Sequence, residues 1–147
     1  MTTGWAAADM AELGHRHARL EGECKLDELM ETLCADPVYE FHPLGLTFRG
    51  GDTTRRYYDQ FIRNFMPRIE GYDLVDEWVN ERSVAQEYEI RVKREGSIIT
   101  LRTVGVLFVD ASSIETGDPR LGGERIYGGE QLVREFAGQM YSELRPL

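Results

Sequence analysis

The first part of the chain has the spacing of an amphipathic helix. Apolar side chains and one histidine recur every three or four residues, which puts them on one helical face. These residues are Met10, Leu13, His17, Leu20 and Cys24. A second apolar register starts at Leu26, and Gly22 weakens the helix between the two. We therefore predict helix over residues 7–35, either as two helices or as one helix broken near residues 22–25. It should end at Asp36-Pro37, because the residue before a proline avoids helical angles.

Beyond this region the pattern predicts mainly strands. Strands are expected at 38–42, 46–49, 72–80, 83–94, 98–109 and 124–128, and helices at 53–65 and 129–140. The polar segment 111–123 is predicted to be a loop. Because strands mostly follow strands, we predict an α+β fold with one domain over residues 1–147. A curved, mainly antiparallel sheet is expected to wrap around the N-terminal helices.

The strand predicted at residues 98–109 is apolar on both faces, so each face needs a cover. Helices are expected on one face. On the other face Val104, Val106 and Phe108 form an apolar row, which predicts a homodimer through the outer sheet face. On the inner side we expect an apolar cavity between the first helix, the helix at 53–65 and the sheet. Its expected lining is Leu20, Tyr58, Phe61, Trp78, Tyr88 and Leu101.

Composition narrows the range of partners. The chain has 147 residues and a formal net charge of −9, which argues against binding to nucleic acid or to an anionic membrane. A neutral or cationic small ligand is compatible with this charge. Cys24 and Cys34, placed in one predicted helix, lie too far apart to bridge and indicate a reducing, cytoplasmic compartment. We expect no metal and no cofactor, because the three histidines lack ligand spacing and no nucleotide-binding fingerprint is present.

Several segments together resemble a known family. The segment Asp36 to Gly45 (DPVYEFHPLG) combines a strand with a proline-glycine turn, and Phe48-Arg49-Gly50 leads into a helix that carries Tyr58 and Phe61. Leu26-Asp27 lies in the preceding helix, and Arg125 to Gly128 precedes the last helix. This order resembles ketosteroid isomerases, SnoaL-like cyclases and nuclear transport factor 2. The resemblance implies a cone-shaped α+β barrel, in a superfamily that holds both enzymes and binding modules.

The resemblance also implies site residues. The general base of ketosteroid isomerases would correspond to His42, their oxyanion-hole tyrosine to His17, and their second oxyanion donor to a position near Gly105, which has no side chain. The acids of limonene epoxide hydrolase find no match, since Ile126 and Tyr127 stand where an acid is expected.

Imidazole can act as acid or base near neutral pH, so the leading hypothesis is a cofactor-independent isomerase, cyclase or dehydratase. Its substrate would be a hydrophobic, steroid- or polyketide-like molecule. The alternatives are that each histidine only packs and that the chain is a non-catalytic binding module.

Overall fold

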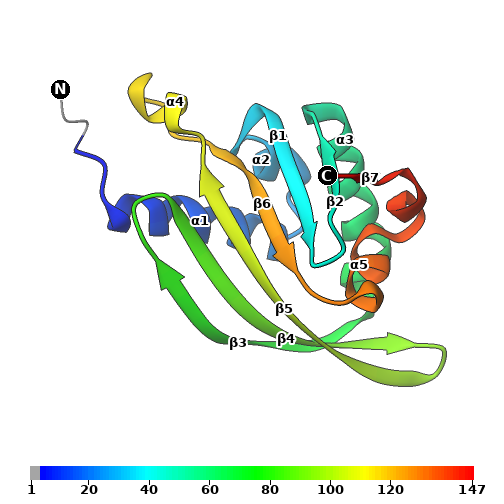
Figure 1. Ribbon diagram of the computed structural model, residues 1–147. Helices are drawn as coiled ribbons and strands as arrows, with labels where there is room; N and C mark the ends of the chain where they lie inside the picture. The colour runs from blue at the N-terminus through cyan, green and yellow to red at the C-terminus, as the bar shows by residue number, and fades with distance from the viewer. Residues whose placement is uncertain (1–3) are drawn as a thin grey trace.

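A strongly curved sheet of seven strands forms the body of the chain in the computed structural model, which describes residues 4–147 (Figure 1). The strand order is β3-β4-β5-β6-β1-β2-β7. Within this part of the chain β1 and β6 pair in parallel and all other neighbours pair antiparallel. The strands are β1 (Leu33–His42), β2 (Leu46–Arg49), β3 (Ile69–Val79), β4 (Ser83–Arg94), β5 (Ser97–Val109), β6 (Leu121–Tyr127) and β7 (Arg145–Pro146).

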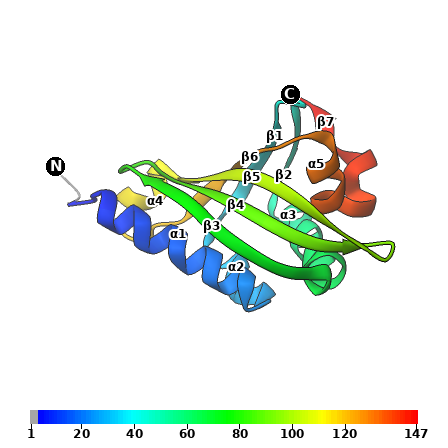
Figure 2. The same cartoon turned by 90° about the horizontal axis from the view of Figure 1, so that it is seen from below.

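Helices lie on one side of this sheet, which confirms the predicted α+β class. They are α1 (Ala7–Gly22), α2 (Leu26–Met30), α3 (Gly51–Gln60), α4 (Ala111–Glu115) and α5 (Glu130–Ala137). Figure 2 shows α1 running along β3 and β4, while α3 and α5 lie toward the other end of the long strands.

Strict alternation in β4 and β5 decides which side chains face the helices. Val84 pairs with Leu107 and Ile90 pairs with Leu101, and all four side chains are buried. Their sequence neighbours point to the outer face, as the two-residue period of a strand requires. The inner face therefore forms the core together with the apolar faces of α1, α3 and α5.

Of the two alternatives predicted for residues 7–35, two helices are present, but the predicted helical C-terminal end is wrong. Cys24 adopts a positive φ of 58°, which separates α1 from α2 by a turn. Residues Leu33–Asp36 belong to β1, so Cys24 and Cys34 do not share a helix. The reason is a tertiary pairing: Leu121 donates its backbone N–H to the carbonyl of Thr32, and this contact draws the segment into the sheet.

Two further boundaries differ from the prediction. The helix expected at residues 53–65 starts at Gly51 as α3 and changes at Phe61 into a wider π-helical turn, Phe61–Phe65, followed by a tight turn, Met66–Arg68. The loop expected at 111–123 contains α4 and the start of β6. Across residues 4–147 no helix has the length and apolar character needed to cross a membrane.

Gly123 allows the parallel contact between β6 and β1, and its replacement tests the fold. It has a φ of +142°, and a Cβ atom there would overlap the backbone of Val38. We predict that Gly123→Ala lowers the free energy of unfolding by more than about 2 kcal/mol. Gly22→Ala is the control, because a Cβ at Gly22 meets nothing within 4 Å and the helix favours alanine. Equal stability of both variants in urea denaturation would contradict this packing.

Candidate active site

The inner side of the sheet encloses a cavity of about 140 Å³ between α1, the α3 segment and strands β3 to β6. This is where the sequence predicts a pocket. Aromatic rings make up much of the wall: Tyr57, Tyr58, Phe61, Phe65, Tyr72, Tyr88 and Phe136. The exposed lining residues, Gly22 on α1 and Tyr72 on β3, lie at the mouth. A ligand inside would therefore meet apolar surface on most sides.

A chain of buried hydrogen bonds closes the deep side of the cavity. His17 on α1 is 1 % exposed and bonds through Nδ1 to Thr32 Oγ1 at 2.7 Å and through Nε2 to the Tyr58 hydroxyl at 3.0 Å. The Tyr58 hydroxyl lies 2.5 Å from that of Tyr39 on β1. These four side chains join α1, α3, β1 and the turn before β1.

The direction of each hydrogen bond in this chain follows from Thr32. The Thr32 hydroxyl donates its hydrogen to the carbonyl of Leu29 at 2.7 Å, so His17 Nδ1 must donate to Thr32. Burial lowers the pKa of His17 to about 3, so the ring is neutral and Nε2 accepts a hydrogen bond from the Tyr58 hydroxyl. Tyr39 then donates to Tyr58. Both nitrogens of His17 are occupied, which leaves neither of them for a ligand.

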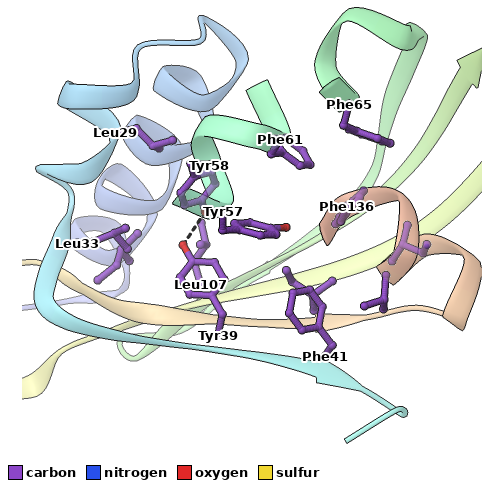
Figure 3. Close-up of a cluster of buried hydrophobic side chains, with 14 of the residues drawn as sticks. Leu29, Leu33, Tyr39, Phe41, Tyr57, Tyr58, Phe61, Phe65, Leu107 and Phe136 are labelled. Carbon is purple, nitrogen blue, oxygen red and sulfur yellow. Dashed lines mark hydrogen bonds between the residues drawn. The ribbon is translucent and has the colours of Figure 1, made fainter. Parts of the chain in front are cut away.

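Tyr57 and Tyr58 are adjacent in α3 but differ in the use of their hydroxyl groups. Figure 3 shows the bond between Tyr58 and Tyr39, whereas the Tyr57 ring extends to the side where Phe136 lies. The Tyr57 hydroxyl has no hydrogen-bond partner within residues 4–147, and the ring lines the cavity. It is available as a donor to a bound molecule.

Two carboxyl groups lie in the same cavity wall. Glu21 comes from α1, one turn after His17, and Glu124 comes from the inner face of β6, where it pairs with Leu107 of β5. A Cβ atom at Gly105 would collide with Oε2 of Glu124. Gly105 therefore provides the room for this carboxyl, which explains a glycine inside an otherwise bulky strand.

Neither carboxyl has a hydrogen bond or ion pair to another side chain in the described part of the molecule, 4–147. Burial raises the pKa of Glu21 to about 7. The pKa of Glu124 is raised well above its usual value, by burial first and then by the negative charge of Glu21. The two groups therefore hold at least one proton between them near neutral pH.

The polar content of the cavity is otherwise small. The lining contains Gln86, Thr103 and the phenols, and it contains no lysine or arginine. Within residues 4–147 no group of three histidine, cysteine or acidic side chains converges to hold a metal. The wall thus offers two acids and a free phenol in apolar surroundings, which suits proton transfer to or from a bound molecule.

The residues predicted to line the pocket are only partly brought together. His17, Tyr58, Phe61 and Tyr88 line the cavity. Leu20 and Leu101 are buried in the core outside its wall.

Trp78 lies on the outer face of the sheet and is 50 % exposed. The cause is a register shift between Leu74 and Asp76, which reverses the faces of the strand before Trp78 is reached.

His42 does not meet His17 in the cavity. It shares the outer sheet face with Glu40, whose Oε1 lies 2.9 Å from His42 Nε2, and its ring stacks on Tyr127. Tyr39 and Phe41 point inward at the alternate positions of β1. A catalytic role for His42 stays a prediction, and its position gives it no contact with a ligand in this cavity.

The sequence contained signals for both missed acids. Glu21 follows His17 by four residues and so shares its helical face. Glu124 precedes Ile126 by two residues and so shares its strand face. The acid sought at Ile126 or Tyr127 is thus found at Glu124, whose carboxyl group lies over Gly105.

Comparison with solved structures identifies the fold. No protein-family model matches the sequence, and no curated protein matches it. The enzyme SalBIII, described as epoxide hydrolase/cyclase-like and linked to pyran ring formation in the polyether salinomycin, is 14 % identical with a TM-score of 0.65, covering 84 % of this chain and 93 % of that one. An NTF2-like protein from Anabaena variabilis is 17 % identical with a TM-score of 0.65, covering 82 % and 90 %.

A third similar structure comes from Shewanella denitrificans and is assigned as a SnoaL-like polyketide cyclase. It is 14 % identical with a TM-score of 0.60, covering 86 % of this chain and 94 % of that one. The chain therefore has the SnoaL-like, NTF2-like fold that its sequence resembles. At these identities the likeness concerns the fold, and the site must be argued from this chain's own residues.

The two neighbouring tyrosines allow a matched test of the hydrogen-bond chain. We predict that Tyr58→Phe lowers the free energy of unfolding by about 1–3 kcal/mol, because His17 loses its donor and Tyr39 loses its acceptor. Tyr57→Phe removes a hydroxyl without a partner and should cause no loss. Denaturation in urea measures both, and a loss of the same size in the two variants would refute the assigned bonds.

Proposed function

We propose that the chain binds a small apolar molecule in this cavity and transfers a proton on it, with Glu21 as the base and Glu124 as the acid. This proposal is supported mainly by the two carboxyl groups without a side-chain partner in a cavity lined by aromatic rings. The reaction class is isomerisation, ring closure or elimination. The histidine chemistry expected from the sequence is thereby assigned to two glutamates instead.

The division of roles rests on the order in which the two groups ionise. Glu21, with a pKa of about 7, is ionised in a large part of the molecules at neutral pH and is still basic enough to remove a proton. The charge on Glu21 then holds the proton on Glu124, which can return a proton to the ligand. The free hydroxyl of Tyr57 adds a donor for an oxygen that becomes negative.

The size of the cavity favours a small ligand. Its volume is about 140 Å³, and a cavity of about 150 Å³ in another protein binds benzene. We therefore narrow the expected steroid- or polyketide-like substrate to a molecule that places one or two rings inside. The described activity of SalBIII, ring formation, is compatible with acid-base chemistry of this kind.

A chemical probe tests the base directly. Removal of the C3 proton of 5-nitro-1,2-benzisoxazole breaks its N–O bond and gives a coloured cyanophenolate, without any other co-reactant. We predict that Glu21→Gln lowers the rate by about 100-fold or more. The wild-type rate should rise with a midpoint near pH 7, the pKa of Glu21, and Glu124→Gln should keep this midpoint.

His42→Ala is the control, because His42 lies outside the cavity and should not affect the rate. Loss of activity in His42→Ala with full activity in Glu21→Gln would return the catalytic role to His42. Binding of the probe without reaction above buffer would support the non-catalytic binding module instead.

We also propose that two copies pair through the outer sheet face. Val104, Val106 and Phe108 lie there half-buried, beside Trp78 and the 41 % exposed Tyr127. No helix in the part of the chain described here covers this row. A second copy would remove these rings from water, which is favourable by about 25 cal/mol per Å².

The dimer is tested by sedimentation velocity at high micromolar concentration, where we predict a species of twice the chain mass. The Val106→Glu variant should sediment as a monomer, since the substitution places a charge in the centre of the apolar row. Ile98→Glu is the control, because Ile98 is 58 % exposed near the far end of β5. A wild-type monomer at this concentration would count against the proposed interface.

A further inference from the structure

We infer that the ligand of this cavity carries a protonated amine beside an apolar ring, with the ammonium group bound between Glu21 and Glu124. The inference uses the cavity of the proposed function but does not depend on turnover. It names the chemical class that the wall recognises.

The two carboxyls in the cavity lack the partner cation that other acids of this chain have. On the outer face Glu87 and Glu89 also form a pair, and Arg102 bridges them at 2.7 and 2.9 Å. The cavity lining contains no lysine or arginine that could do the same for Glu21 and Glu124. Both side chains are half-buried and line the cavity. A buried, unpaired acid is costly, so the missing cation is expected from the ligand.

The aromatic wall of the cavity also suits an ammonium ligand. Tyr57, Phe61, Tyr88 and Phe136 line the same space. Ring faces attract ammonium groups, and the rings also accept an apolar body attached to the amine. The net charge of −9 favours the approach of a cation to the mouth at Gly22 and Tyr72. An anionic ligand would meet repulsion at each of these steps.

The pH dependence of binding follows from the groups that face the pair. His17 on α1 stays neutral because burial lowers its pKa to about 3. Burial raises the pKa of the phenols above their usual value, on β1 for Tyr39, on α3 for Tyr57 and Tyr58, and on β4 for Tyr88. Tyr72 on β3 is the remaining phenol, at the mouth. Between about pH 6 and 8 the titration that matters is therefore that of the carboxyl pair itself.

An ammonium ligand binds the ionised form of Glu21, so its affinity should rise as the pH passes about 7. A neutral ligand prefers an uncharged wall and should bind no better at high pH. The affinity of an ammonium ligand should therefore rise with pH, whereas that of a neutral ligand should not. A fit to the size and shape of the cavity alone would give both ligands the same pH dependence.

Isothermal titration calorimetry with three one-ring probes tests the inference. At about pH 8 we expect benzylamine to bind at least about tenfold more tightly than its neutral counterpart benzyl alcohol, and benzoate not to bind. Between about pH 8 and 6 the affinity for benzylamine should fall about tenfold, as Glu21 takes up a proton. Equal or tighter binding of benzyl alcohol, or no binding of benzylamine up to its solubility limit, overturns the inference.

The variants separate this result from the proposed function. Glu21→Gln should lose the preference for benzylamine over benzyl alcohol, and binding of benzyl alcohol shows that the variant is folded. Glu124→Gln should keep the preference, because it replaces a protonated carboxyl with a neutral amide of the same shape. Glu87→Gln, which removes an acid from the outer face, should keep the preference. Preference for the amine without benzisoxazole turnover overturns only the catalytic proposal. Turnover without any preference for the amine overturns only the ammonium site.

Discussion

The buried chain from Tyr39 through Tyr58 and His17 to Thr32 is the constraint on which the site depends. It ties α1 to α3 and to the first strand, with every hydrogen directed toward the Leu29 carbonyl. Because His17 fixes the rotation of α1, Glu21 one turn later must face the cavity. The histidine thus acts as a positioning residue for an acid.

The opposite wall carries the second half of the site. Gly105 on β5 has no side chain, and the carboxyl group of Glu124 on the neighbouring strand β6 occupies the space that this leaves. Two half-buried acids in an apolar wall without a cation destabilise the folded state. Such a cost is typical of sites that serve a ligand. This electrostatic cost is confined to the cavity. The rest of its wall is mainly apolar, and Glu87 and Glu89 on the outer face are paired with Arg102.

Much of the fold could be predicted because it depends on periodicity. The strand at Ser83–Arg94 has the predicted bounds, and the α+β order follows from the spacing of apolar residues and turns. The site was harder to predict, because it depends on register. A bulge before Trp78 and the outward position of His42 beside Glu40 are decided by strand pairing, and a resemblance to a family cannot supply either. The alternation of Tyr39 and Phe41 with Glu40 and His42 was, however, visible in the sequence.

The central claim is that Glu21 and Glu124 share a proton in an apolar cavity, and carbon-13 NMR titration of the glutamate carboxyls tests it most directly. Comparison with Glu21→Gln and Glu124→Gln assigns the two resonances. The account predicts that Glu21 titrates near pH 7 and that Glu124 keeps its proton to a higher pH. Titration of both carboxyls near 4.5, the ordinary value for glutamate, would contradict it.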